Sequence, residues 1–378
     1  MFEGLKPRTG DPLLSLIGEF ARDPRPGKID MGVGVYRDEQ GRTPVFRAVK
    51  AAEARLLESQ DSKSYIAPGD DPRFVDLLRP LIFGTMATEA IGVHTAGGTG
   101  ALRLAAALIA AAKPGARIWL GVPSWFAHAP IFAGAGLEVR EYPCFDPERQ
   151  LLLFDETMAA LERAGSGDAV LLHGCCHNPT GADFSADQWG RIAALIARRG
   201  LLPVVDLAYQ GLGEGVEADA AGLGRILAAA GTVVVAYSCD KNFGLYRERV
   251  GALFVRPGDI ALADPIRSTL FALAPMAPDH GASVVRIILE DPALRRDWRD
   301  ELDGMQRRIA GIRAQLAVAD PFLAPLGAQR GMFSLLPLSP TRIEGLRRDH
   351  GVYMAASGRV NLAGLTLEGL SRFVAALR

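Results

Sequence analysis

Short apolar runs alternate with longer amphipathic segments through the middle of the chain. The short runs are rich in β-branched residues, which is typical of strands buried on both faces. We expect such strands at 117–122, 169–173, 202–206, 232–237 and 251–255. In the longer segments, apolar residues recur at helical spacing, and we expect helices at 100–112, 125–133, 186–199 and 220–230. This alternation predicts an α/β fold whose mostly parallel sheet is flanked by helices.

The pattern changes in the C-terminal part of the chain. One long charged helix is expected first, then two short apolar pieces and a terminal helix, at 297–317, 332–336, 352–355 and 367–377. These features indicate a second, smaller α/β domain formed by both chain ends. We expect an N-terminal arm and part of the small domain at 1–45, the large domain at 46–296 and the rest of the small domain at 297–378.

Composition and charge narrow the class of protein. The chain has 378 residues, of which 49% are hydrophobic and 22% charged, so it can bury a large core. Its 42 Lys and Arg nearly balance 43 Asp and Glu, which predicts no attraction to nucleic acid or anionic membranes. We expect neither a secretory signal nor a run of the ~20 apolar residues that a membrane span needs. Two of the four cysteines are adjacent, which favours a reducing cytoplasm.

Candidate chemistry follows the expected strands at their carboxyl ends, where α/β sheets bind ligands. Lys241 comes soon after the strand at 232–237, and its amine could form a Schiff base with an aldehyde cofactor. Ser238 and Arg249 flank it, and a hydroxyl with a guanidinium suits a phosphate dianion. Taken singly, Lys241 is better read as a solvated surface lysine, and Arg249 as half of a surface salt bridge.

Three more segments carry candidate groups. The glycines at 97–100 lead into an apolar helix, where backbone N–H groups can cradle phosphate or simply form a tight loop. Asp206 ends a strand, and its carboxylate could pair with a protonated pyridine nitrogen or cap the next helix. The segment 173–181 holds two histidines and two cysteines, but their spacing is wrong for structural zinc, so we expect no metal. Asn178-Pro179 within it predicts a turn that holds an amide over a site.

In their order and spacing, these segments resemble the class I aminotransferases of pyridoxal-phosphate fold type I, most of all the aspartate and aromatic amino acid subgroup. The resemblance covers essentially the whole chain. It runs from Phe2-Glu3 and Asp11-Pro12 through Gly32-Val33-Gly34-Val35-Tyr36 to Ser357-Gly358-Arg359-Val360-Asn361. It implies a pyridoxal 5'-phosphate cofactor, ping-pong transfer between amino acids and 2-oxo acids, and a homodimer with shared active sites.

The resemblance also implies catalytic and cofactor-binding roles. Lys241 resembles the lysine that carries the cofactor and moves a proton, and Asp206 resembles the partner of the pyridinium nitrogen. Tyr209 and Asn178 resemble hydrogen-bond donors to the cofactor's phenolate oxygen, and Trp125 resembles an indole stacked on its ring. The residues that resemble phosphate-binding groups are Gly98, Thr99, Ser238, Arg249 and, from a partner subunit, Tyr65.

Substrate contacts follow from the same resemblance. Arg359 resembles the arginine that clamps the substrate α-carboxylate, with Gly34 and Phe333 beside it, while Trp125 and Asn178 also face the substrate. His128 and His173 resemble groups that lie behind Asp206, although either could be an ordinary buried histidine.

The sequence departs from the subgroup at two positions. Phe271 stands where an ungapped count places the partner-chain arginine for a distal carboxylate, and Arg267 lies four residues upstream. Truncating one partner of a buried charge pair costs ~2–5 kcal/mol, so we expect aromatic or other hydrophobic substrates to be preferred over aspartate. Asp240, next to Lys241, stands where relatives usually have serine, and its charge could pair with Arg249 or simply tune the site.

Three alternatives remain open from the sequence. The same cofactor machinery would serve β-elimination or decarboxylation. Transamination could instead be specific for aspartate. A non-catalytic ligand-binding regulator could also use this fold.

Overall fold

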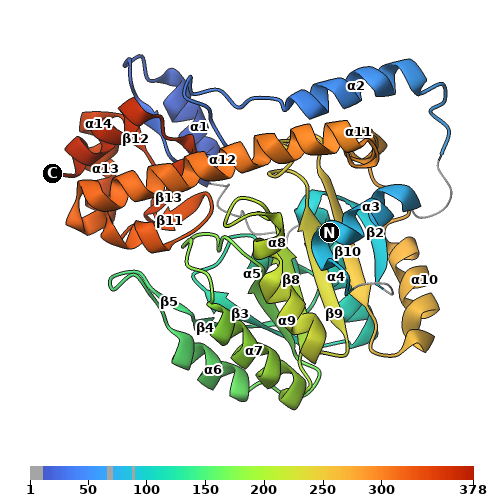
Figure 1. Ribbon diagram of the computed structural model, residues 1–378. Coiled ribbons are helices and arrows are strands. Elements are labelled where there is room, and N and C mark those ends of the chain that lie inside the picture. The colour runs from blue at the N-terminus through green and yellow to red at the C-terminus, as the bar shows by residue number, and fades with distance from the viewer. Residues whose placement is uncertain (1–11, 66–70, 87–89) are drawn as a thin grey trace, which may run out of the picture.

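The centre of the molecule is a seven-stranded sheet (Figure 1). A computed structural model describes residues 12–65, 71–86 and 90–378, so Phe2-Glu3 and Asp11 of the expected motifs lie outside the described residues. The strands run in the order β2-β10-β9-β8-β7-β3-β4. Their bounds are β2 (Ile91–Ala96), β3 (Arg117–Val122), β4 (Glu138–Pro143), β7 (Ala169–His173), β8 (Leu202–Leu207), β9 (Val233–Ser238) and β10 (Val250–Arg256).

Five of these strands were expected from the sequence and are confirmed, and β3 and β7 have the expected bounds. The neighbours from β9 through β8, β7 and β3 to β4 pair in parallel, whereas β10 runs antiparallel to both β9 and β2. No helix separates β9 from β10, and a parallel pairing would need a longer crossover. The strands β2 and β4 were missed, because glycine and histidine interrupt the first and charged residues the second.

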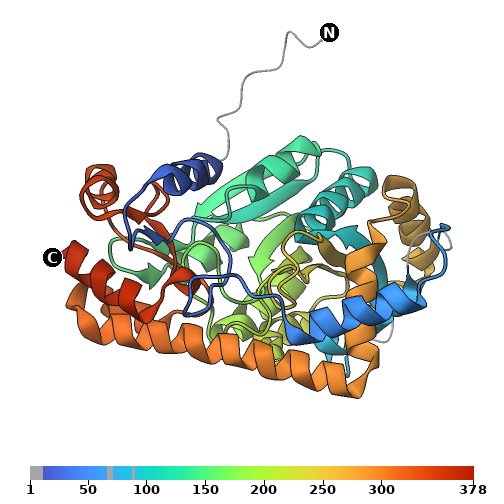
Figure 2. The same ribbon diagram turned by 90° about the horizontal axis from the view of Figure 1, so that it is seen from above.

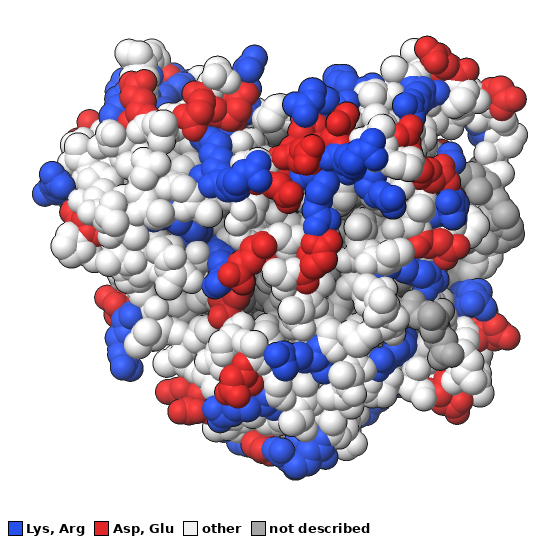
Figure 3. Space-filling model, in the orientation of Figure 1, with Lys and Arg blue, Asp and Glu red and all other residues white. Residues whose placement is uncertain are grey.

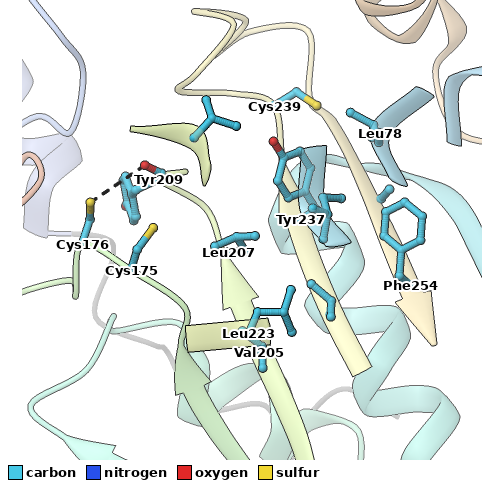
Figure 4. Close-up of a cluster of buried hydrophobic side chains, with 14 of the residues drawn as sticks. Leu78, Cys175, Cys176, Val205, Leu207, Tyr209, Leu223, Tyr237, Cys239 and Phe254 are labelled. Atoms are coloured by element: carbon cyan, nitrogen blue, oxygen red, sulfur yellow. Dashed lines mark hydrogen bonds between the residues drawn. The ribbon is translucent and has the colours of Figure 1, made fainter. Parts of the chain in front are cut away.

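Successive strand residues point to opposite faces of the sheet and enter two different cores. Val204, Val234 and Ala236 belong to the core on one face, whereas Val205 and Tyr237 belong to the core on the other. Figure 4 shows part of the second core, in which aromatic, aliphatic and cysteine side chains crowd together. Burial on both faces explains why these strands are continuously apolar in the sequence.

Helices cover both faces of the sheet (Figure 2). The first core receives α4 (Gly97–Ala112), α5 (His128–Gly134) and α10 (Ala263–Leu273). The second receives α2 (Arg47–Ser59), α3 (Pro72–Phe83), α6 (Phe154–Glu162), α7 (Ala186–Arg199), α8 (Val216–Asp219), α9 (Ala221–Ala229) and α11 (Asp279–Glu290). The ends of α7 match its sequence, since Ser185 and Gln188 form a capping box and Gly200 ends the helix with φ 62°.

The 28-residue helix α12 (Pro292–Ala319) runs from the sheet to a smaller unit built from both chain ends (Figure 1). Ile29 and Met31 pack there in a third core with residues of the C-terminal segment. The unit contains α1 (Pro12–Arg22), α13 (Pro340–His350), α14 (Leu367–Leu377), the parallel pair β1 (Ile29–Asp30) and β12 (Val352–Tyr353), and the antiparallel pair β11 (Phe333–Leu335) and β13 (Arg359–Asn361). The domain boundaries after residues 45 and 296 stay a prediction, and α12 runs through the second of them.

A short hairpin, β5 (Phe145–Asp146) with β6 (Leu151–Leu152), completes the strands. Acidic and basic side chains alternate over the face shown in Figure 3, in keeping with the formal net charge of −1. Within the described ranges, no helix has both the length and the apolar character to cross a membrane.

Candidate active site

A cavity of about 190 Å³ lies at the carboxyl ends of the parallel strands, beside the start of α4. It brings together most of the residues that the sequence singled out, namely Gly34, Gly98, Thr99, Trp125, His173, Asn178, Asp206, Tyr209, Ser238, Lys241, Phe333 and Arg359. Asp240, which the sequence marked as a departure from the subgroup, also lines it, together with Leu102, Phe126 and Ala208. Of these, Phe126 could have been found from its place next to Trp125.

Lys241 follows β9 and points into this cavity. Its Nζ lies 3.8 Å from Oδ2 of Asp240 and 5.3 Å from the ring centroid of Tyr209. Burial lowers the pKa of the Lys241 amine; the carboxylates of Asp240 and Asp206 oppose this shift, and Arg249 adds to it. A lowered pKa increases the fraction of neutral amine, which is the nucleophilic and basic form.

The segment after Lys241 is fixed by contacts that the sequence did not reveal. The Trp298 Nε1–H on α12 donates to the backbone oxygen of Asn242 at 2.7 Å. The Trp298 ring stacks on Phe243, with centroids 4.6 Å apart and planes 9° apart. The Asn242 amide donates to the hydroxyl of Tyr237 at 2.8 Å. The long helix therefore holds the backbone that carries the lysine.

Asp206 lies near the end of β8, and its side chain faces a histidine rather than a helix N-terminus. Asp206 Oδ2 is 2.9 Å from His128 Nε2, and His128 Nδ1 is 2.8 Å from the hydroxyl of Ser124. His128 is fully buried, and its ring packs edge-on against His173 at 5.0 Å. Burial holds the pKa of His173 well below its ordinary value, so this ring is neutral. The result is an oriented carboxylate that faces the cavity.

Tyr209 and Asn178 meet at a neighbouring point of the cavity. The Asn178 Nδ2 donates to the Tyr209 hydroxyl at 3.2 Å. Burial raises the pKa of Tyr209, so its phenol keeps the proton that it can donate. Among the described residues, Asn178 Oδ1 is buried without a hydrogen-bond partner. This pair therefore offers polar groups to a ligand.

The opposite wall comes from the smaller unit. Arg359 on β13 is 7% exposed, and its guanidinium donates to the backbone oxygen of Gly32 at 2.8 Å. The same guanidinium lies 4.8 Å from the ring centroid of Phe333. A Cβ atom at Gly34 would come within 2.9 Å of that ring, so glycine is needed for this close packing. The planar cation is thus held in place where it could bind a carboxylate bidentately.

The first turn of α4 approaches β9 and β10 at the other end of the cavity. Gly97 has φ 69°, and a Cβ atom at Gly98 would lie 3.0 Å from the Cβ of Ser238. Arg249 pairs with Asp240 and also donates to the backbone oxygen of Tyr246 at 3.2 Å. The sequence had suggested the Arg249–Asp240 pair, and the structure confirms it. Backbone N–H groups, a hydroxyl and a guanidinium therefore gather at one point.

Two expected site residues lie away from the cavity of this chain. Tyr65 is 92% exposed, and Phe271 on α10 is 39% exposed. Neither is among the residues that line the cavity. Their expected roles, which depend on a partner subunit, stay predictions.

Cys175, Cys176 and Asp219 bring possible metal-ligand atoms within 4.8 Å of one another. The Asp219 carboxylate already accepts backbone N–H groups from Gly211, Gly213 and Glu214 at 2.8–2.9 Å. These contacts favour a structural role in fixing that loop. His128, His173 and Asp206 lie similarly close, but this carboxylate and these rings already contact one another. The expectation that no metal binds stays a prediction.

Comparison with known proteins gives consistent matches over nearly the whole chain. Residues 26–377 match the family described as aminotransferase class I and II. The chain is 56% identical to a tyrosine aminotransferase of Rhizobium meliloti (strain 1021), over 97% of this chain and 96% of the relative. It is 43% identical to an aspartate aminotransferase of Salmonella typhi, over 98% of each.

Solved structures also match the fold over the whole chain. An aromatic-amino-acid aminotransferase from Burkholderia pseudomallei, covalently bound to pyridoxal phosphate, superimposes with a TM-score of 0.95 at 34% identity. The match covers all of this chain and 98% of that one.

Proposed function

Because the chain belongs to the class I and II aminotransferase family, we propose that it moves the α-amino group between amino acids and 2-oxo acids with pyridoxal 5'-phosphate as its cofactor. The observation that carries this proposal is the placement of Lys241 and Asp206 at the ends of the adjacent strands β9 and β8, in one cavity. A buried amine and an oriented carboxylate are the two groups that this chemistry requires.

The residues present fit the cofactor. Asn178 Oδ1 is a buried polar atom without a partner among the described residues, and Asp206 faces the cavity with His128 behind it. When bound, pyridoxal phosphate supplies a covalent attachment for the amino group and an electron sink for the charge left at Cα. Lys241, Asp206, Tyr209, Asn178 and Trp125 would hold its ring. Gly98, Thr99, Ser238 and Arg249, which we call the phosphate subsite, would hold its phosphate.

The protein's own groups then have distinct tasks. Burial lowers the pKa of the Lys241 amine, which favours its neutral, basic form. This amine would take the proton from the substrate Cα and hold it for return when the amino group has been transferred. The Asp206 carboxylate, oriented by His128, stabilises a positive ring nitrogen. The Arg359 guanidinium binds the substrate α-carboxylate and fixes Cα within reach of the lysine.

Two exposed residues support a homodimer with shared active sites. Tyr65 and Phe271 are large aromatic side chains on the surface of the single chain. We assign Tyr65 to the phosphate and Phe271 to the substrate side-chain pocket, each in the partner subunit. We place the enzyme in the cytoplasm, where its four buried, unpaired cysteines would stay reduced.

The substrate side-chain pocket favours aromatic or other hydrophobic groups. Trp125, Phe126, Phe333 and Leu102 line the cavity, and Phe271 stands where a cation for a distal carboxylate was expected. The test is the ratio of kcat/KM for phenylalanine to that for aspartate. A clear preference for aspartate would show that another cation, such as Arg267, serves the distal carboxylate.

The central test replaces Lys241 with alanine. Transamination should collapse while the cofactor still binds, whereas alanine at the exposed Lys113 should change neither. Surviving turnover in Lys241→Ala would refute the proposal. Mixing the wild-type enzyme with an amino acid alone should convert the cofactor stoichiometrically to its amine form. A lyase or decarboxylase would instead release its product with the cofactor still in the aldehyde form.

A further inference from the structure

Asp240 is a buried carboxylate that the proposed reaction does not use. It is 2% exposed and lies between β9 and β10. Its Oδ1 accepts the backbone N–H of Val250 at 3.3 Å, and its Oδ2 pairs with the guanidinium of Arg249. The same Oδ2 lies 3.8 Å from Nζ of Lys241. Two cations of the site therefore meet one carboxylate of the chain.

This carboxylate also lies against the first turn of α4. A Cβ atom at Gly97 would be 3.2 Å from Asp240 Oδ2 and 2.6 Å from a guanidinium nitrogen of Arg249. The backbone N–H of Asp240 donates to the Ser238 hydroxyl at 3.2 Å. Asp240 thus contacts or adjoins the helix N-terminus, the hydroxyl and the guanidinium of the phosphate subsite, which are the groups that attract an anion.

We propose that the Asp240 carboxylate competes with phosphate for Arg249 in the phosphate subsite. This competition weakens the binding of phosphate-bearing ligands. This inference rests on the proposed function, because it takes the cofactor phosphate as the natural ligand. Without that ligand, the Asp240–Arg249 pair keeps the guanidinium satisfied and in position. With the ligand, two anions share one guanidinium at close range, and their repulsion lowers the affinity.

The competition is specific to phosphate, which gives the test its control. Pyridoxal has the same aldehyde and ring as the cofactor but no phosphate, so it does not need Arg249. Asp240 also acts on Lys241, and that effect is common to both ligands. The ratio of the pyridoxal Kd to the pyridoxal-phosphate Kd therefore isolates the phosphate interaction.

The experiment compares the apo forms of the wild type, Asp240→Asn and Asp240→Ser. Asparagine keeps the shape and removes the charge, and serine also removes the bulk. Each form is titrated with pyridoxal phosphate, with pyridoxal and with inorganic phosphate, and Asp155→Asn, at an exposed carboxylate, is the control. Removing the charge should raise the Kd ratio about tenfold or more and tighten inorganic phosphate binding by a similar factor. The control should change neither.

The outcomes separate the two proposals. If wild-type protein binds pyridoxal phosphate but both variants keep its Kd ratio and its phosphate affinity, Asp240 does not compete and this inference is wrong. A lower ratio in both variants would show that Asp240 assists phosphate binding, which also overturns it. If the wild type fails to bind pyridoxal phosphate at all, the proposed function itself is wrong.

Discussion

Trp298 is the contact through which α12 supports the segment that carries Lys241. Its side chain is 1% exposed, donates to the Asn242 carbonyl at 2.7 Å and stacks on Phe243 at 4.6 Å. Trp298→Phe keeps most of the ring packing but leaves that buried carbonyl without its donor, which costs ~1–3 kcal/mol. Trp298→Ala also removes the stack and opens a cavity, so we expect a loss of ~3–5 kcal/mol.

Urea denaturation of the apo protein measures the loss of unfolding free energy, and hydrogen–deuterium exchange of residues 239–244 locates it. Exchange in this segment should accelerate in both variants, and more in Trp298→Ala. The control is Trp189→Phe, at another buried tryptophan, which lies on α7 and packs edge-on against Phe184. It should leave exchange at 239–244 unchanged. If Trp298→Phe changes stability by less than ~0.5 kcal/mol and leaves exchange unaltered, the hydrogen bond does not support the lysine segment.

Three further predictions concern the charged groups of the cavity. Asp206→Asn should lower kcat by ~10²–10³-fold, as expected for losing one preorganised electrostatic group, and an unchanged steady-state kcat would exclude this role. Arg359→Lys keeps the charge but loses the planar guanidinium that can bind a carboxylate with two hydrogen bonds, so kcat/KM should fall ~30-fold or more. Arg330→Lys, on the surface, should keep the wild-type kcat/KM. At pH values between the lowered pKa of Lys241 and its ordinary value of 10.5, the folded apo protein binds fewer protons at this residue than the unfolded protein does. The unfolding free energy should therefore rise with pH across that range, and Lys241→Met should flatten the rise in urea titrations at several pH values.

The sequence predicts the catalytic end of the sheet because two local patterns coincide there. An apolar run marks each strand, and a polar residue marks the point where the run ends. Since β8 and β9 pair in parallel, the ends that carry Asp206 and Lys241 meet at one edge. No end of these two strands lies more than one residue from the expected position. Only strand direction had to be assumed, and the alternation with helices supports it.

The local sequence patterns could not predict the direction of a strand or the contacts between residues far apart in the chain. An apolar run buried on both faces reads the same in either direction, so the reversed course of β10 is not encoded in its own residues. The support of Lys241 by Trp298 depends on where α12 lies against the segment after β9, and the two residues that meet there, Asn242 and Trp298, are more than fifty positions apart in the chain. Ser124 was missed for a similar reason, because its contact with His128 depends on the turn that begins α5.

The balance of acidic and basic side chains at the cavity determines how well it can bind further anions. A buried carboxylate is costly unless a cation pairs with it, and Asp240 meets this requirement through Arg249 and Lys241. Lys241, Arg359, Asp206 and Asp240 line the pocket, and Arg249 adjoins it through Asp240, so three basic groups and two carboxylates meet there. A phosphate dianion and a substrate carboxylate would together add three negative charges. In this pocket the affinity for phosphate is therefore limited by a charge of the chain itself, and a change of Asp240 that raises this affinity also acts on the Lys241 amine 3.8 Å away.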